Sequence, residues 1–97
     1  MKITVASKRD GASGWYVGRP SALGNPFTMR TEADRDRVIG QYREWLAHKI
    51  ADRDAAVMNE LNAMLKHEEI TLVCWCAPKR CHADVIAQWL HTMSETK

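Results

Sequence analysis

The sequence contains no long run of hydrophobic residues, although 45% of its 97 residues are hydrophobic. Its longest uninterrupted apolar stretch falls far short of the roughly 20 residues that a helix needs to cross a bilayer. The first residues of the chain also lack the apolar core of a secretory signal peptide. We therefore expect no membrane association and a cytoplasmic location.

The chain also lacks a strong excess of either charge, since its formal net charge is only +2. A dedicated duplex-DNA binder usually carries a larger basic excess, so we do not expect duplex DNA as a ligand. The charges are distributed unevenly: residues 1–30 hold five bases and one acid, residues 31–69 six bases and nine acids, and residues 70–97 three bases and two acids. The two basic ends favour an anionic ligand held between them.

Cysteine is scarce, and its three copies, Cys74, Cys76 and Cys81, lie close together. An odd number of closely spaced cysteines is a poor basis for a disulfide framework. We therefore expect reduced thiols with a local role.

The length and the hydrophobic pattern predict a single α/β domain over residues 1–97, with its core at about 3–93. Strands are expected at residues 3–7, 15–17 and 70–76. Helices are expected at residues 31–50, from about 52 or 54 to 65, and from about 81 or 82 to 93. This β-β-α-α-β-α order predicts a small three-layer, Rossmann-like sheet in which the last strand pairs alongside the first. A domain of this size holds one modest core, so we expect any site to be a surface cleft.

The segment after the last expected strand carries the most chemistry. It runs from Cys76 to His82 and leads into the last expected helix. In open α/β sheets, ligands bind beyond the carboxyl ends of the strands, where the next helix presents unpaired N–H groups. We therefore expect Lys79 and Arg80 to bind an anion there.

The same location favours thiol chemistry, because cations and a helix N-terminus stabilise a thiolate. The candidate nucleophiles are Cys81 and Cys74. His82 is the candidate proton carrier, and Asp84 is expected to orient it. Whether the chain catalyses a reaction is left open at this point.

The cysteines allow three other interpretations. Four side chains match the ligand number of a tetrahedral zinc site: Cys74, Cys76, Cys81 and His82. That site requires the strand to end at Cys74, because alternate residues within a strand lie about 6.5–7 Å apart with parallel side chains. Cys74 and Arg80 also fit the Cys-x5-Arg arrangement of protein tyrosine phosphatases, although Pro78 supplies no N–H to such a loop. Finally, Cys74 and Cys76 are compatible with a buried core strand. No cofactor is expected, and zinc is left as an open alternative.

The second cluster is the irregular segment from Gly18 to Phe27, whose two prolines and two glycines exclude a helix or a central strand. Its glycines, Gly18 and Gly24, allow close backbone approach. Three of its side chains offer donors to a phosphate, a carboxylate or a base edge: Arg19, Ser21 and Asn25. An ordered loop without a ligand fits the same composition, so both interpretations stay open.

Two motifs in these clusters resemble those of a known family. One runs from Tyr16 to Phe27 and contains GRPSALGNPF, and the other runs from Leu72 to Asp84 and contains CWCAPKRCHAD. In order and spacing, both are similar to the signatures of a family of short phage and bacterial proteins described only as a domain of unknown function. The resemblance extends over roughly residues 16–90. It implies a compact α/β fold in a phage or mobile-element setting, within a bacterial cytoplasm, and it names no reaction.

Together, the two clusters predict one composite site, in which the loop from Gly18 to Phe27 faces the turn from Cys76 to His82. The leading hypothesis is a cleft that holds a small phosphorylated ligand, above all a nucleotide, with thiol and histidine chemistry as a further step. The alternative is a non-enzymatic phage protein that engages a host protein or single-stranded nucleic acid. In that alternative, the cysteines hold a structural zinc ion or form a buried thiol cluster.

Overall fold

The computed structural model describes residues 1–76 and 79–95. In chain order, its elements are β1 (Lys2–Ser7), the 3-10 helix η1 (Lys8–Asp10), β2 (Trp15–Tyr16), the 3-10 helix η2 (Glu32–Asp34), α1 (Arg35–Ala51), α2 (Ala55–Met64), β3 (Glu69–Cys74) and α3 (His82–Glu95). The strands and α-helices therefore follow the expected β-β-α-α-β-α order. The last strand ends at Cys74, two residues earlier than its apolar pattern predicts. Residues 77 and 78 of the following turn lie outside the described residues.

β3 is the central strand of a three-stranded parallel sheet with the order β1-β3-β2. Its pairing with β1 runs from Lys2 opposite Glu69 to Ser7 opposite Cys74. β2 contributes only Trp15 opposite Leu72 and Tyr16 opposite Val73. The central place of β3 agrees with its apolar sequence, because a strand with neighbours on both edges and a covered face is shielded from water. The expected pairing of the last strand with the first is confirmed.

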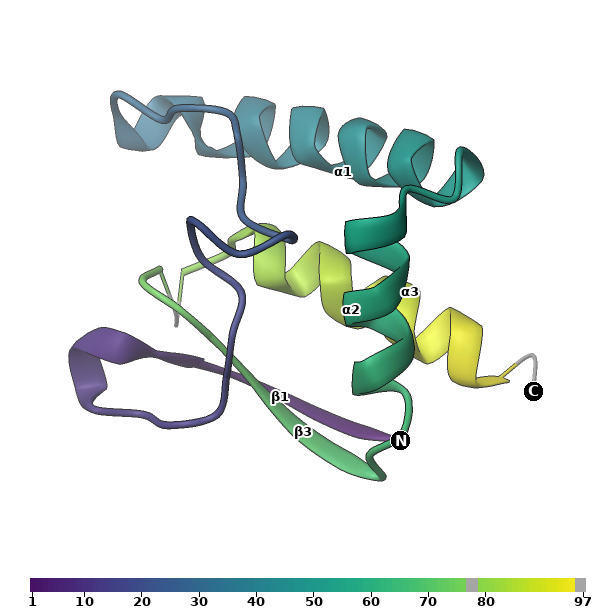
Figure 1. Cartoon of the computed structure of the whole chain (residues 1–97). Coiled ribbons are helices and arrows are strands. Elements are labelled where there is room, and N and C mark those ends of the chain that lie inside the picture. Colours follow the sequence, from purple (N-terminus) through teal and green to yellow (C-terminus); the bar gives the residue numbers. More distant parts are fainter. Residues whose placement is uncertain (77–78, 96–97) are drawn as a thin grey trace.

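The helices cover one face of this sheet. Ile3 and Val5 of β1 pack with Leu72 against the core, whereas Thr4 points to the opposite face and is exposed. Figure 1 shows α1, α2 and α3 on the same side of β1 and β3. The fold is thus a small mixed α/β structure, and the expected three-layer, Rossmann-like arrangement is not observed.

The short connection between β1 and β2 explains why the described helices cover only one face of the sheet. Residues 8–14 contain only the 3-10 helix η1, and a helical crossover would need a dozen or more residues. Instead, this segment lies against the outer face of the sheet. A Cβ atom on Gly14 would lie 2.6 Å from the carbonyl oxygen of Thr71, so a side chain at this position would collide with β3.

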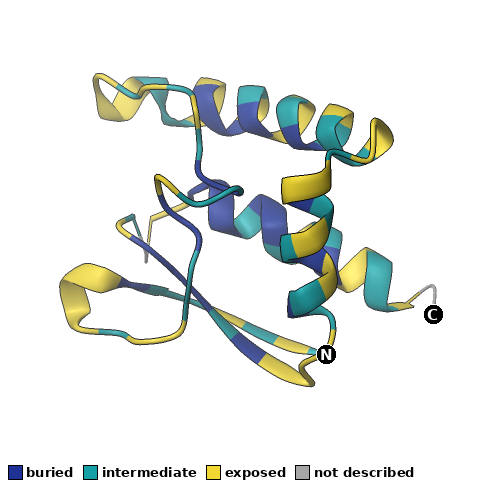
Figure 2. Ribbon diagram, in the orientation of Figure 1, coloured by how far each residue is buried: buried dark blue, intermediate teal, exposed yellow. Residues whose placement is uncertain are grey.

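The core lies between the sheet and the helices, and its buried residues line the inner faces of α1 and α3 and much of β3 (Figure 2). Tyr42 of α1 is fully buried there and donates a hydrogen bond from its hydroxyl to the carbonyl oxygen of Leu23, at 2.6 Å. Leu23 is also fully buried, so this bond fastens the irregular loop to α1. Burial raises the pKa of the Tyr42 phenol well above its usual value. Among the described helices, none has the length and apolarity that a bilayer crossing requires.

The bond from Tyr42 predicts a stability effect. We expect Tyr42→Phe to lower the free energy of unfolding by about 1–3 kcal/mol, because the carbonyl of Leu23 would stay buried without its donor. The measurement is urea unfolding followed by circular dichroism. Thr92→Val is the control, since it removes an exposed hydroxyl bond to the carbonyl of Gln88 and should change stability by less than about 0.5 kcal/mol. Equal effects of the two substitutions would contradict the fastening role of Tyr42.

Candidate functional site

A cleft of about 290 Å³ opens where the loop after β2 faces the turn after β3. Residues from three separate parts of the chain form its walls. They include Gly18, Arg19, Asn25 and Phe27 of the loop, Arg35 of α1, and Trp75, Cys76, Arg80, Cys81 and His82 after β3. The two clusters singled out in the sequence therefore meet in space.

His82 joins the two clusters. It is the first residue of α3, is only 8% exposed, and its Nε2 lies 2.7 Å from the carbonyl oxygen of Val17. A carbonyl oxygen only accepts, so Nε2 carries the hydrogen and Nδ1 keeps the lone pair. Burial lowers the pKa of His82, which keeps its ring neutral near pH 7. A neutral imidazole of fixed orientation thus forms part of the cleft wall.

Asp84 acts on the helix start and not on the ring of His82. Its carboxylate accepts a hydrogen bond from the backbone N–H of Cys81 at 3.0 Å, and its own N–H donates to the carbonyl of Cys81 at 3.1 Å. This reciprocal pair caps the first turn of α3. The contact that orients His82 therefore comes from Val17, whereas the sequence suggested Asp84.

Arg35 is a cleft residue that the sequence did not single out. Its side chain is 14% exposed and donates to the carbonyl oxygen of Arg80 at 2.6 Å, and to both carboxylate oxygens of Glu32 at 2.9 Å. It also contacts the thiol of Cys76. Arg35 therefore ties the start of α1 to the turn after β3. Forty-five residues separate it from Arg80, and in the sequence it looks like an ordinary surface charge of a helix start.

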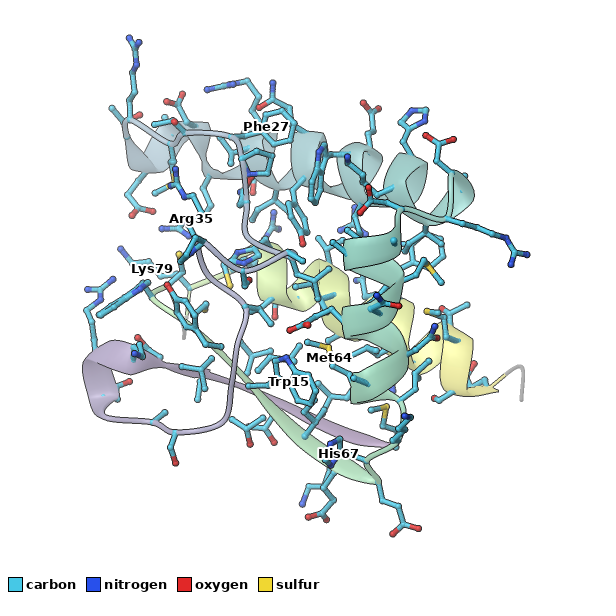
Figure 3. The ribbon with its side chains drawn as sticks, viewed as in Figure 1. Trp15, Phe27, Arg35, Met64, His67 and Lys79 are labelled. Atoms are coloured by element: carbon cyan, nitrogen blue, oxygen red, sulfur yellow. The ribbon has the colours of Figure 1, made fainter. Side chains whose placement is uncertain are left out.

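Lys79 and Arg80 are exposed and pair with acids of η2 and of the first turn of α1. Lys79 binds Glu32 at 3.1 Å, and Arg80 binds Asp36. Figure 3 shows Arg35 and Lys79 on the same side of the molecule, where both reach Glu32. Hydrogen bonds from Arg35 and then Lys79 lower the pKa of Glu32 to about 2. Exposed pairs of this kind contribute little to stability, so a competing anion can replace them at small cost.

Arg19 differs from these cations. It is exposed on the wall of the cleft, and within residues 1–76 and 79–95 its guanidinium has no carboxylate partner. Its backbone carbonyl accepts a hydrogen bond from the hydroxyl of Tyr16 at 2.9 Å, and the peptide bond to Pro20 is cis. The charge of the Arg19 guanidinium is therefore available to a ligand.

The other loop residues mainly shape the loop. Asn25 lines the cleft, and its side-chain oxygen accepts from the N–H of Phe27 at 2.9 Å, which closes an Asx turn. Gly24 lies against the backbone of Arg19, where a Cβ would approach to 3.0 Å. Ser21 lies outside the cleft wall, and its buried hydroxyl has no hydrogen-bond partner among the described residues. The close packing of the loop therefore explains the glycine at position 24. Asn25 and Gly18 remain candidates for contact with a ligand.

The three thiols lie in two different environments. Cys74 and Cys81 are 1% and 3% exposed, and their sulfur atoms lie 3.1 Å apart. The contact with Cys74 and then burial raise the pKa of Cys81, which disfavours its thiolate. Cys76 is only half-buried and lines the cleft beside Arg35. The geometry thus favours Cys76 as the accessible thiol, whereas the sequence favoured Cys81 or Cys74.

Of the four candidate zinc ligands, Cys74 and Cys81 are in contact, but the set of four does not come together. Although β3 ends at Cys74, Cys76 lies beside Arg35 and the Nε2 of His82 is engaged by Val17. Among the residues described by the structure, no group of three or more His, Cys, Asp or Glu side chains is arranged to hold a metal ion. Part of the Cys-x5-Arg segment, Ala77 and Pro78, lies outside the described residues.

Comparison with known families identifies the family of the chain. A family model described as "Domain of unknown function (DUF4326)" matches residues 4–92. The chain belongs to the DUF4326 family. No curated protein and no solved structure matches it. The resemblance noted in the sequence is thereby confirmed at the level of a domain of unknown function, and the function of this DUF4326 domain has to be argued from its cleft.

The thiol environments predict unequal reactivity. We expect iodoacetamide to modify Cys76 of the native protein at least about tenfold faster than Cys74 or Cys81, because both of the latter thiols are shielded from solvent and the raised pKa of Cys81 also disfavours its thiolate. Mass spectrometry of peptides gives the rate at each site. Cys76→Ser should remove the fast reaction, and Cys74→Ser should leave it unchanged. Faster labelling of Cys81 than of Cys76 would overturn this assignment.

The burial of His82 predicts a pH dependence of stability. In the unfolded chain the ring takes up a proton near pH about 6.5, whereas the buried ring resists protonation, so the unfolded state binds more protons. The free energy of unfolding should therefore fall as the pH drops from about 7 to about 5. The lowered pKa values of Glu32 and Asp34 act below this window, since their ordinary values are 4.5 and 3.8. Urea unfolding of His82→Gln should show a flatter profile, and an unchanged profile would refute the assignment.

Proposed function

We propose that the cleft binds the phosphate group of a small phosphorylated ligand, in the first place a nucleotide. The observation that carries the proposal is Arg19, an exposed guanidinium on the cleft wall without a carboxylate partner among the described residues. Arginine suits this role because its planar fork of donors matches the oxygens of a phosphate.

The charge around the cleft supports an anionic ligand. Four basic side chains gather near it, and two carboxylates partly offset them. The basic residues are Arg19, Arg35, Lys79 and Arg80, and the acids are Glu32 and Asp36. Arg80 is the second cation that we assign to the phosphate, because its pair with Asp36 is exposed and exchanges readily. Arg35 remains bound to Glu32 and to the carbonyl of Arg80, so it holds the backbone of Arg80 in place.

The neutral ring of His82 adds a hydrogen-bond acceptor to the cleft wall. Its Nε2–H is committed to Val17, so the acceptor Nδ1 is the atom that remains for hydrogen bonding. A neutral ring with a lone pair suits a hydroxyl donor of a sugar better than it suits a phosphate oxygen. Thiol chemistry on such a ligand would start from Cys76, which is the half-buried thiol beside Arg35.

The biological setting proposed from the sequence is a phage or mobile element acting in a bacterial cytoplasm. This setting is inferred from the resemblance of the two motifs alone, and the geometry of the cleft has no bearing on it. The alternative of an interaction protein for a host partner would gain weight if no phosphorylated small molecule bound.

A ligand titration tests the phosphate site. Adenosine monophosphate at 100 times its dissociation constant should stabilise the protein by about 2.7 kcal/mol, which raises the melting temperature by several degrees. Arg19→Ala should weaken the binding by about tenfold to a hundredfold, because it removes a charge-assisted contact. Arg37→Ala is the matched control: Arg37 is an exposed arginine of α1 that pairs with Asp34 outside the cleft. Equal binding by both variants would refute the site.

A further inference from the structure

Trp75 is exposed at the rim of the cleft. It follows β3 directly, lines the cleft wall, and its residue surface is 51% exposed. Among the described residues, it is the large hydrophobic residue that the fold leaves open to solvent. Tryptophan has a large apolar face and a polar N–H, so an exposed indole on a cleft wall offers a flat surface that a ligand can cover.

The indole is held in one place by the residues around it. Its Nε1–H donates to the hydroxyl oxygen of Tyr16 at 3.1 Å, and that hydroxyl in turn donates to the carbonyl of Arg19. On the backbone side, the Nε of Arg9 donates to the carbonyl of Trp75 at 3.1 Å. A ring fixed before binding loses little conformational entropy when a ligand stacks on it. Through the hydroxyl of Tyr16, these contacts link the ring to the backbone of Arg19, the residue whose guanidinium is assigned to the phosphate.

One lysine and one arginine lie near the indole ring. The ammonium of Lys8 lies 5.2 Å from the ring centre of Tyr16 and 6.0 Å from that of Trp75. Lys8 and Arg9 both belong to η1, which carries them to this edge of the sheet. An aromatic face flanked by lysine and arginine is the arrangement with which proteins stack nucleobases while attracting the phosphates attached to them.

The size of the cleft limits the size of the ligand. Its volume of about 290 Å³ is at the small end for ligand sites, which commonly span about 300–1,000 Å³. Such a volume suits a ligand no larger than a mononucleotide. Because Trp75 lines the wall of this cleft and is exposed, a base in the cleft can lie against the indole.

We propose that Trp75 is a base-stacking subsite, and that the ligand of the cleft is a nucleotide whose phosphate binds Arg19 and Arg80 while its base lies on the indole. This inference rests on the proposed phosphate site and adds the class of ligand. Stacking does not read the base edge, so we expect purine and pyrimidine nucleotides to bind with similar affinity, purines somewhat more tightly.

The experiment compares three probes by isothermal titration calorimetry: adenosine monophosphate, ribose 5-phosphate and inorganic phosphate. Wild-type protein should bind adenosine monophosphate roughly 10- to 100-fold more tightly than ribose 5-phosphate. Trp75→Ala should remove this difference while leaving the affinity for ribose 5-phosphate unchanged. Trp75→Phe keeps an aromatic face and should retain most of the preference. Because Trp75 is exposed, both variants should keep the melting temperature of the free protein within about 2 °C.

The failure of each proposal has its own signature. Equal binding of adenosine monophosphate and ribose 5-phosphate by the wild type would overturn the stacking subsite and leave the phosphate site intact. Binding of none of the three probes would overturn the phosphate site itself. A preference for adenosine monophosphate that persists in Trp75→Ala would place the base elsewhere and refute the role of Trp75.

Discussion

The hydrogen bond between the ring of His82 and the carbonyl oxygen of Val17 links the two halves of the cleft. Val17 follows β2, and His82 opens α3, so this bond joins the start of the irregular loop to the start of the last helix. Both residues are buried, and the ring also packs edge-on against Tyr42, with 5.1 Å between the ring centres. A buried carbonyl without a donor is costly, so the loop and the helix stabilise each other's position. The cleft is the space left between them.

The polar side chains near this hydrogen bond fall into two groups: those that are bonded within the protein and those that are available to a ligand. Asp84 caps α3, Tyr42 fastens Leu23, and Arg35 supports the backbone of Arg80. Each of these side chains is committed within the protein. The guanidinium of Arg19 has no carboxylate partner among the described residues, and half of the surface of Trp75 is exposed, with Lys8 as its cation neighbour. The hydroxyl of Tyr16 bonds to the indole N–H of Trp75 and to the backbone carbonyl of Arg19. The groups left available therefore suit a ligand that combines an anion with a flat apolar ring.

Much of the fold could be predicted from local patterns. The apolar run from Ile70 to Cys76 indicated a strand, and the structure places β3, which ends at Cys74, between the other two strands. The two clusters were expected to meet, and the observed parallel pairing of β2 with β3 explains why they do, because parallel strands end at the same edge of a sheet. The single helical layer could not be read from the order of elements. It depends on the connection of residues 8–14 lying against the outer face, which is a tertiary contact of Gly14.

The details of the site depended on contacts that the sequence does not contain. Cys74 and Cys76 look equivalent in the chain, yet the strand ends between them, and only Cys76 lies in the half-buried cleft wall. Arg35 carries no local signal, since its partner Arg80 is forty-five residues away. The acid nearest His82 in sequence, Asp84, turned out to bind backbone, because a helix start offers it an unpaired N–H.

The most direct measurement is a titration of the isotope-labelled protein with adenosine monophosphate, followed through its backbone amide resonances. Amides of residues 18–25 and of residues 79–82 are expected to shift together and to give one dissociation constant, because both segments border one cleft. Shifts confined to one of these segments, or centred on α2, would contradict a composite site.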